Sequence, residues 1–223
     1  MPSNLHHRRI FMVHGLNLHC SGNTFARMNY LAHCYLAFGN PDLLAGQFIA
    51  DDVKGRKFEN FPDAIRRGIL LHRFVDHFTD TWPGCLEIRA KLRPHLGLFS
   101  GIALDVFFDH ILALEWDTHS ELEKTTFIQQ TYETLSGYEG HMTEKRKYLF
   151  HKMVEADWLG RYDKIEGISL TLTQMSRRIP GGEILLKATD QLEENKKFIT
   201  EVFKIFFPQL IYATQTKLDT FAP

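Results

Sequence analysis

Residues 105–112, DVFFDHIL, place two carboxylates and an imidazole inside a run that is otherwise apolar from residue 102 to residue 114. Asp105 and Asp109 are four residues apart, so in a helix they lie about 40° from each other on one stripe. Apolar residues share that stripe, which predicts that it is buried. Two buried carboxylates repel each other and lose hydration, so a positive partner is required, either arginines or a metal ion. His110 is expected to reach the same ion only if the ion lies at the helix edge.

Helix signals also dominate the rest of the chain. Asn40-Pro41 and Asn60-Phe61-Pro62 each combine a capping residue with a proline suited to a first turn, and residues 120–123 have the pattern of a capping box. No segment alternates with period two over a useful length, and no Asn-Gly or Asp-Gly hairpin signal occurs. We predict a single all-α domain of roughly eight to ten helices. The expected helices cover residues 28–38, 42–53, 63–79, 84–93, 100–116, 120–135, 143–158, 163–177 and 183–207, with Pro208 breaking or kinking a last segment that resumes to about 217.

Bulk composition excludes several classes of protein. The 223 residues have 44% hydrophobic content and a formal net charge of −1. This balance argues against a nucleic-acid-binding protein, which usually carries a basic excess. The three cysteines form no CxxC pair, which favours a reducing cytoplasm. No apolar run reaches the length of a membrane span, and no GxGxxG, P-loop or GxSxG motif occurs.

The first 27 residues differ from the rest. They contain three arginines and four histidines but no acid. The segment resembles a signal peptide only weakly, because His14 and Gly15 interrupt its apolar stretch. We interpret residues 1–27 as a poorly structured leader, consistent with an upstream start codon, and residues 28–223 as the folded domain beginning at Met28.

A second acidic stripe is expected on the helix at 63–79. His72, Asp76 and Asp80 are spaced at i, i+4 and i+8 and share one face. A separate apolar face on the same helix leaves open that this stripe simply faces water.

Two single residues complete the candidate group. His33 is the only ionisable side chain in MNYLAHCYLAF, where a hydrogen-bonded core histidine is the alternative. Asp51 ends LLAGQFIAD, where pairing with Lys54 is the alternative. Four helices that each supply an inward histidine or aspartate predict a metal centre in a helical bundle. The imidazole and carboxylate ligands suit Mn, Fe, Zn or Mg, and the many oxygens favour Mn or Mg.

Basic residues supply candidate anion contacts. Arg177 and Arg178 lie near a predicted helix end, and Arg66, Arg67 and Arg73 share the helix of His72. The cluster EKRK at residues 144–147 fits a solvated helix face.

Six blocks then occur in order: MNYLAHCYLA from Met28, LLAGQFIADDVKG from Leu43, FPDAIRRGILLHRFVDHFTD from Phe61, DVFFDHILALEW from Asp105, WLGRY from Trp158 and MSRR from Met175. Together, over about residues 28–215, they resemble the bacterial acyl carrier protein phosphodiesterase family. That resemblance implies an all-helical relative of the HD-type metal-dependent phosphohydrolases.

The resemblance also implies an activity and a site. The expected reaction hydrolyses the phosphodiester that links 4'-phosphopantetheine to a serine of acyl carrier protein, with a divalent metal, typically Mn²⁺. Asp51 is the first choice for an essential carboxylate, although Asp52 stands where the family pattern is more often apolar. The expected metal ligands are His33, Asp51, His72, Asp76, Asp105, Asp109 and His110. On this basis Asp109→Ala is expected to abolish turnover while leaving the fold intact.

The remaining roles follow from the chemistry. Asp51 or Asp76 would orient the water or accept its proton, and His33 or His110, if not a ligand, would protonate the leaving serine. The residues expected to hold phosphate oxygens are Arg73, Arg177 and Arg178. Because carrier proteins are acidic, a basic docking surface is expected, drawn from Arg66, Arg67, Lys145, Arg146 and Lys147.

Two other functions are compatible with these residues. One is a metal phosphohydrolase of a small phosphodiester or nucleotide, since one fold hosts many chemistries. The other is a non-catalytic helical protein that binds the carrier, with its carboxylates paired to arginines.

Overall fold

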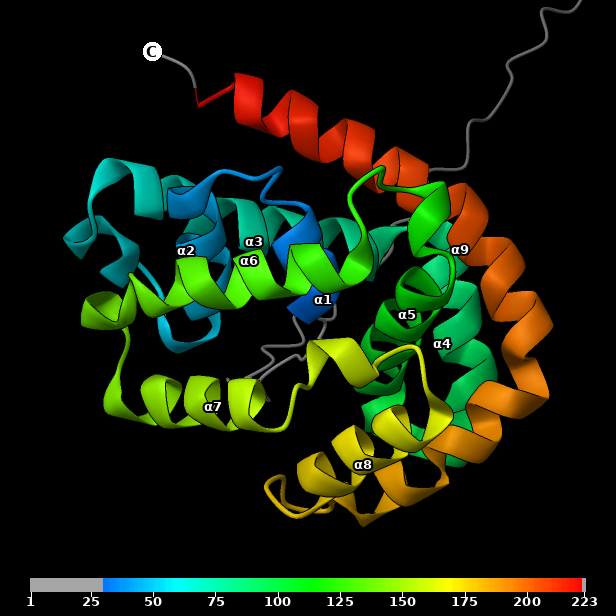
Figure 1. The fold of residues 1–223 in the computed structure, drawn as a ribbon. Helices are drawn as coiled ribbons and strands as arrows, with labels where there is room; N and C mark the ends of the chain where they lie inside the picture. The colour runs from blue at the N-terminus through cyan, green and yellow to red at the C-terminus, as the bar shows by residue number, and fades with distance from the viewer. Residues whose placement is uncertain (1–29, 222–223) are drawn as a thin grey trace, which may run out of the picture.

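The computed structural model describes residues 30–221, and within that range the chain is all-helical, as predicted (Figure 1). Nine α-helices, joined by short 3₁₀ turns, make up these residues. The leader expected at 1–27 and the start at Met28 lie outside the described residues. The helices are α1 Tyr30–Tyr35, α2 Pro41–Ile49, α3 Asp63–Thr81, α4 Pro83–Leu96, α5 Ser100–Leu114, α6 Lys124–Ser136, α7 Glu144–Glu155, α8 Ile165–Ser176 and α9 Ala188–Asp219.

Helix α5 is the central element of the core. Of its fifteen residues, only Gly101 and Leu114 are not buried. It packs against α1, α4, α8 and α9, so apolar side chains are needed around most of its circumference. This explains the continuous apolar run of the sequence.

Of the three capping signals in the sequence, the one at Asn40 is confirmed and the other two are wrong. Pro62, not Asn60, is the residue before α3, and no side chain caps that helix. Asn40 caps α2 by accepting the N–H of Leu43 at 3.0 Å, and Thr143 caps α7 by accepting the N–H of Arg146 at 3.2 Å. The capping box predicted at residues 120–123 does not form, because α6 begins at Lys124 without a side-chain cap. The Ser120 hydroxyl instead accepts the N–H of Leu122.

Of the two effects expected at Pro208, a break or a kink, the break does not occur. Helix α9 runs through Pro208 without interruption and arches around the outside of the molecule (Figure 1). Pro208 lies on the exposed side of α9, while Phe207 and Leu210 flank it in the core. The carbonyl that loses its helical partner therefore faces water, and core packing on both sides of the proline keeps the helix continuous.

A close crossing of α2 and α3 positions the site. A Cβ added at Gly46 would lie 2.2 Å from the carbonyl oxygen of Ile65, and one added at Gly68 would lie 2.5 Å from that of Leu43. Two glycines thus allow the two backbones to touch. As a result, the 3₁₀ turn Ala50–Asp52 that continues α2 lies beside the middle of α3.

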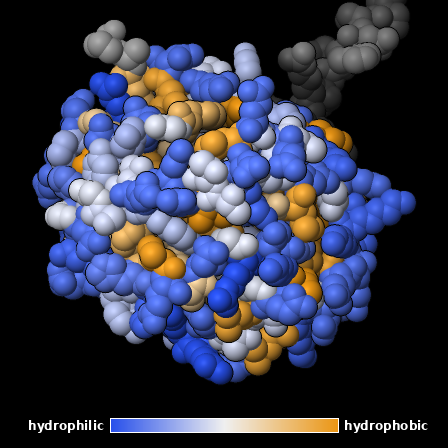
Figure 2. Space-filling view, viewed as in Figure 1, coloured by the Kyte–Doolittle hydropathy of each residue, from blue (hydrophilic) through white to orange (hydrophobic). Residues whose placement is uncertain are grey.

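The stretch Pro83–Leu114, which comprises α4, α5 and the turn between them, is long and apolar enough for a membrane-spanning helix by length and composition alone. However, 78% of the tested window is buried inside the protein, as is usual for core helices. On the face shown in Figure 2, hydrophobic residues form separate patches among hydrophilic ones.

Candidate metal centre

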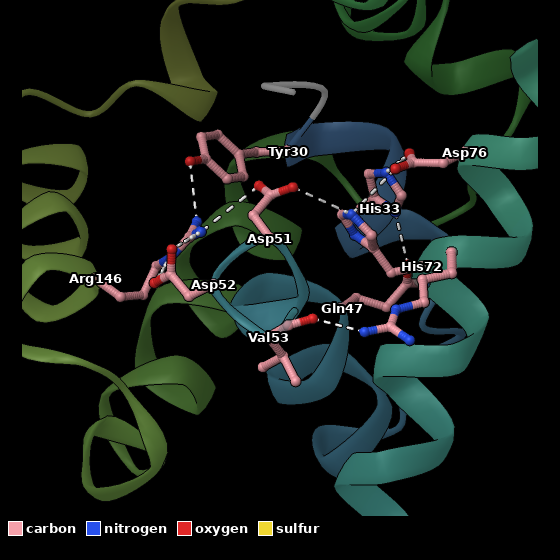
Figure 3. A network of polar contacts seen from close by, with 10 residues as sticks. Tyr30, His33, Gln47, Asp51, Asp52, Val53, His72, Asp76 and Arg146 are labelled. Atoms are coloured by element: carbon pink, nitrogen blue, oxygen red, sulfur yellow. Dashed lines mark hydrogen bonds and ion pairs between the residues drawn. The ribbon is translucent and has the colours of Figure 1, made fainter. Parts of the chain in front are cut away.

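Two histidines and one aspartate from two helices converge at the α2–α3 crossing (Figure 3). His33 comes from α1, and His72 and Asp76 come from successive turns of α3. Within the described residues, one ligand atom from each of the three lies within 4.8 Å of the other two. The two imidazole rings stack, with centroids 4.0 Å apart.

The Asp76 carboxylate bridges the Nε2 atoms at the edges of the two stacked imidazoles. Its Oδ1 is 3.3 Å from Nε2 of His33, and its Oδ2 is 3.4 Å from Nε2 of His72. The i, i+4 spacing of His72 and Asp76 on α3 produces the second contact. Both histidines are buried, whereas 22% of the Asp76 side chain is exposed, so the group can be reached from the carboxylate side.

Asp51 extends the group from the turn Ala50–Asp52. Its Oδ1 lies 3.4 Å from Nε2 of His72, and 12% of its side chain is exposed. The pairing of Asp51 with Lys54, the alternative left open by the sequence, is not among the contacts seen. Instead, Asp51 bridges His72 and Arg146, whose Nη2 is 3.6 Å from Oδ2 (Figure 3).

The electrostatics of the group are those of a cation site. Burial works against a charged imidazole, but the carboxylates of Asp76 and Asp51 raise the pKa of His72 to about 9. Burial and the neighbouring His72 lower the pKa of His33. Burial favours the neutral form of Asp76, but the two imidazoles hold its pKa far below the usual range. A single positive charge on His72 is therefore favoured among these carboxylates.

The donor set fits a divalent metal. Imidazole nitrogens and carboxylate oxygens suit Mn, Fe or Zn. The Nδ1 atom of His72 is buried and has no hydrogen-bond partner, and the contact of His33 Nε2 with Asp76 is close but misaligned for a hydrogen bond. His33, His72 and Asp76 can therefore hold a metal ion, and a carboxylate oxygen of Asp51 lies next to His72.

Gln47 supports His33 and was missed by the sequence analysis. Its Oε1 accepts a hydrogen bond from Nδ1 of His33 at 2.7 Å, which directs Nε2 of the ring toward Asp76. Gln47 is buried on α2, one turn before Asp51. The signal was present, because Gln47 is the only polar side chain in LLAGQFIA, but it has no charge and was not considered.

Arg146 is also placed differently from the expectation. It was assigned to a basic docking surface, but only 2% of it is exposed. Its guanidinium forms two bonds to the carboxylate of Asp52, both at 3.0 Å, and donates to the Tyr30 hydroxyl at 3.2 Å. The docking expectation was wrong for this residue because periodicity alone did not reveal that α7 turns this face toward α2.

The three ionisable residues of α5, Asp105, Asp109 and His110, lie outside this group. Asp109 is fully buried and accepts the backbone N–H groups of Leu31 and Ala32, each at 2.9 Å, so it caps the start of α1. His110 donates from Nδ1 to the carbonyl oxygen of Tyr162 at 2.7 Å. Asp105 is buried near Cys85, where its charge adds to burial in raising the pKa of that thiol. None of these three α5 residues joins the group of His33, His72 and Asp76.

The remaining candidate ligands and anion contacts lie outside the group of His33, His72 and Asp76. Asp80, the third member of the α3 stripe, pairs with Arg89 of α4 at 2.9 Å. Arg73 is half-buried and anchors the loop after the site, because its Nη2 donates to the Val53 carbonyl at 2.6 Å. Arg177 and Arg178 are exposed after α8, which packs on α5 and α9 rather than on α2 or α3.

Comparison with known proteins identifies the family. A family model described as "Acyl carrier protein phosphodiesterase" matches residues 28–210. Proteins of that name from Yersinia pestis and Klebsiella pneumoniae (strain 342) are each 30% identical to the chain over 191 and 195 residues, covering 85% of this chain and 99% of each relative. A relative of the same name from Enterobacter sp. (strain 638) is 27% identical over the same share of the chain. No solved structure matches, so the expected likeness to HD-type enzymes stays a prediction. The chain belongs to the acyl carrier protein phosphodiesterase family.

Proposed function

We propose that this protein hydrolyses the phosphodiester between 4'-phosphopantetheine and the serine of holo-acyl carrier protein, releasing the apo carrier. The observation that carries the proposal is the convergence of His33, His72 and Asp76, with Asp51 beside them, inside the region that matches the family. All four residues belong to sequence blocks that carry the family resemblance.

The proposed cofactor is a divalent metal. Imidazole and carboxylate donors suit Mn, Fe or Zn, and Mn²⁺ is proposed because the family resemblance implies it. When bound, such an ion supplies Lewis-acid charge and makes a water molecule more acidic. The proposed ligands are His33, His72, Asp76 and Asp51. Gln47 fixes the tautomer of His33 by accepting its Nδ1 proton.

The chain's own residues then have distinct tasks. Asp51 and Asp76 are the candidates for orienting the attacking water, because each is partly exposed beside the group. Asp51 is the first candidate for accepting its proton, because the lowered pKa of Asp76 makes that carboxylate a weak base. Arg73 has donors close to the site and is the candidate for holding a phosphate oxygen. Arg177 and Arg178 follow α8, which packs on α5 and α9, so the structure adds no support for this role for them.

The proposed partner is an acidic carrier protein, and the proposed setting is the cytoplasm, where the buried, free Cys34 and Cys85 would stay reduced. Of the expected docking residues, Lys145 is exposed, while Arg66 and Arg67 both contact Asp63. If docking is electrostatic, the apparent KM for the carrier should rise with salt.

The test is incubation of the purified protein with holo-carrier and Mn²⁺, followed by mass spectrometry of the carrier. The proposal predicts loss of the prosthetic group, no loss with a chelator, and no loss with Asp76→Asn. Asp117→Asn, a matched change of an exposed aspartate, should behave like the unmodified protein. An intact holo-carrier alongside hydrolysis of a generic diester would instead support a small-molecule phosphohydrolase. Carrier binding without any hydrolysis would support a non-catalytic binding protein.

A further inference from the structure

Arg146 holds an unusual position for a charged residue. It is buried on α7, and its guanidinium contacts residues from three other parts of the chain (Figure 3). Nε and Nη2 bind Asp52, Nη2 also faces Asp51, and Nη1 donates to the hydroxyl of Tyr30. The ring of Phe48 lies 5.4 Å from Cζ. A buried guanidinium with this many partners has a fixed position and orientation.

The contacts to the two aspartates are unequal. Asp52 receives both N–H groups at 3.0 Å in the fork geometry that a carboxylate matches best. Asp51 forms only an ion pair with Nη2, whose distance of 3.6 Å to Oδ2 is too long for a hydrogen bond. Thr143, which caps α7, donates its hydroxyl to Oδ2 of Asp52 at 3.0 Å and so fixes the carboxylate that holds the guanidinium. Asp52 therefore keeps Arg146 close to Asp51 but prevents full pairing with it.

This arrangement orients Asp51. Its Oδ2 faces Arg146, and its Oδ1 faces Nε2 of His72 at 3.4 Å. We infer that Arg146, restrained by Asp52, is a positioning residue that fixes the Asp51 carboxylate with one oxygen directed at the metal group. The inference rests on the proposed function, in which Asp51 is a ligand or base.

A purely structural salt bridge is the competing explanation. The main cost of breaking a buried ion pair is the uncompensated charge left behind, and neutralising both partners together avoids that cost. A structural pair should therefore tolerate joint neutralisation without loss of metal binding or turnover. A positioning pair should not, because Asp51 would lose the group that orients it even though the fold survives.

The experiment compares the full-length protein with Asp52→Asn/Arg146→Gln. We expect a melting temperature close to that of the unmodified protein. The affinity for Mn²⁺ should fall by about tenfold to 100-fold, as it does when other supporting partners of metal ligands are changed. The kcat should fall by about 100-fold, with little change in KM for the carrier. Mn²⁺ affinity is measured by calorimetry without carrier. Asp52→Asn alone should weaken Mn²⁺ binding more than the double variant, because the released guanidinium then pairs fully with Asp51.

Two further variants complete the design. Lys152→Gln/Glu155→Gln neutralises an exposed ion pair on the same helix and should change none of these quantities. If the double variant does not fold, Arg146→Lys replaces it, because a lysine amine keeps the charge but cannot contact Asp52, Asp51 and Tyr30 together. Unchanged Mn²⁺ affinity and kcat in the folded double variant, or in Arg146→Lys, would overturn the inference. Absence of Mn²⁺-dependent hydrolysis in the unmodified protein would instead overturn the proposed function.

Discussion

Replacing Gly46 by alanine should move the turn that carries Asp51 away from α3, the helix that carries His72 and Asp76. The added Cβ would lie 2.2 Å from the carbonyl oxygen of Ile65, 2.7 Å from Cα of Gly68 and 2.8 Å from the backbone N of Ile69. All three are backbone atoms, so no side-chain rotation relieves the overlap. Restoring ordinary contact requires α2 and α3 to move apart by about 1 Å or more.

The expected loss of stability is modest and the expected loss of activity is large. Overpacking of this kind costs about 1–3 kcal/mol, offset by up to about 1 kcal/mol from the higher helix propensity of alanine. The same movement widens the 3.4 Å contact between Asp51 and His72. A misplacement of about 1 Å can lower a rate about 100-fold.

The assay combines urea unfolding, Mn²⁺ calorimetry and the rate of holo-carrier hydrolysis. Gly101→Ala is the matched control, because its Cβ would lie 3.5 Å from the flexible Nη2 end of Arg89. That variant should be neutral or up to about 1 kcal/mol more stable, with an unchanged rate. If Gly46→Ala has the stability and rate of the unmodified protein, the crossing does not set the geometry of the site.

Three further predictions follow from single groups. The metal-free protein should lose stability as pH rises from about 7 to 9, by up to about 1.4 kcal/mol per pH unit, because the raised pKa of His72 means that the native state binds a proton that the unfolded state releases. This contribution to stability is complete below pH 6.5 and is lost as the pH passes 9. Saturating Mn²⁺ should remove the pH dependence of stability. A melting temperature of the metal-free protein that stays constant across this range would contradict the pairing of His72 with Asp76 and Asp51. Asp109→Ala should lower the free energy of unfolding by about 3 kcal/mol or more, since two buried N–H groups lose their acceptor at about 1–3 kcal/mol each. Asp109→Asn, which keeps one acceptor, should cost less. Unchanged stability in the alanine variant would show that Asp109 does not stabilise the start of α1. Thr143→Ala should cost about 1 kcal/mol through loss of the α7 cap, as measured by thermal unfolding, whereas Thr125→Ala on the surface of α6 should be near neutral.

The sequence predicted the helices well because local signals decide them. The spacing of apolar residues and the cap at Asn40 place elements that the structure also contains. Pro208 was misjudged because its effect depends on which side of α9 faces water, which is a property of the packed molecule. The box at Ser120 failed for a similar reason, since the loop before α6 uses that hydroxyl for a different contact.

The site was only partly predictable. His33, Asp51, His72 and Asp76 were identified by their residue type, spacing and family resemblance, and the structure brings them together. For Asp109, burial correctly indicated that a compensating partner was needed, but the partner is the N-terminus of α1 instead of an ion or arginine. A helix N-terminus contributed by a segment 77 residues away leaves no local sequence signal. The role of Arg146 was hidden for the same reason, because it depends on contacts between helices. Gln47 did leave a signal, as the only polar side chain in LLAGQFIA.

The most direct test of the account is the spectrum of bound Mn²⁺. Pulsed electron paramagnetic resonance of the Mn²⁺-loaded protein should detect couplings to imidazole nitrogen, because His33 and His72 are the proposed ligands. These couplings should disappear in His33→Gln/His72→Gln and persist in Asp109→Asn. A spectrum without nitrogen coupling, or one that the double histidine substitution leaves unchanged, would contradict a metal centre at the crossing of α2 and α3.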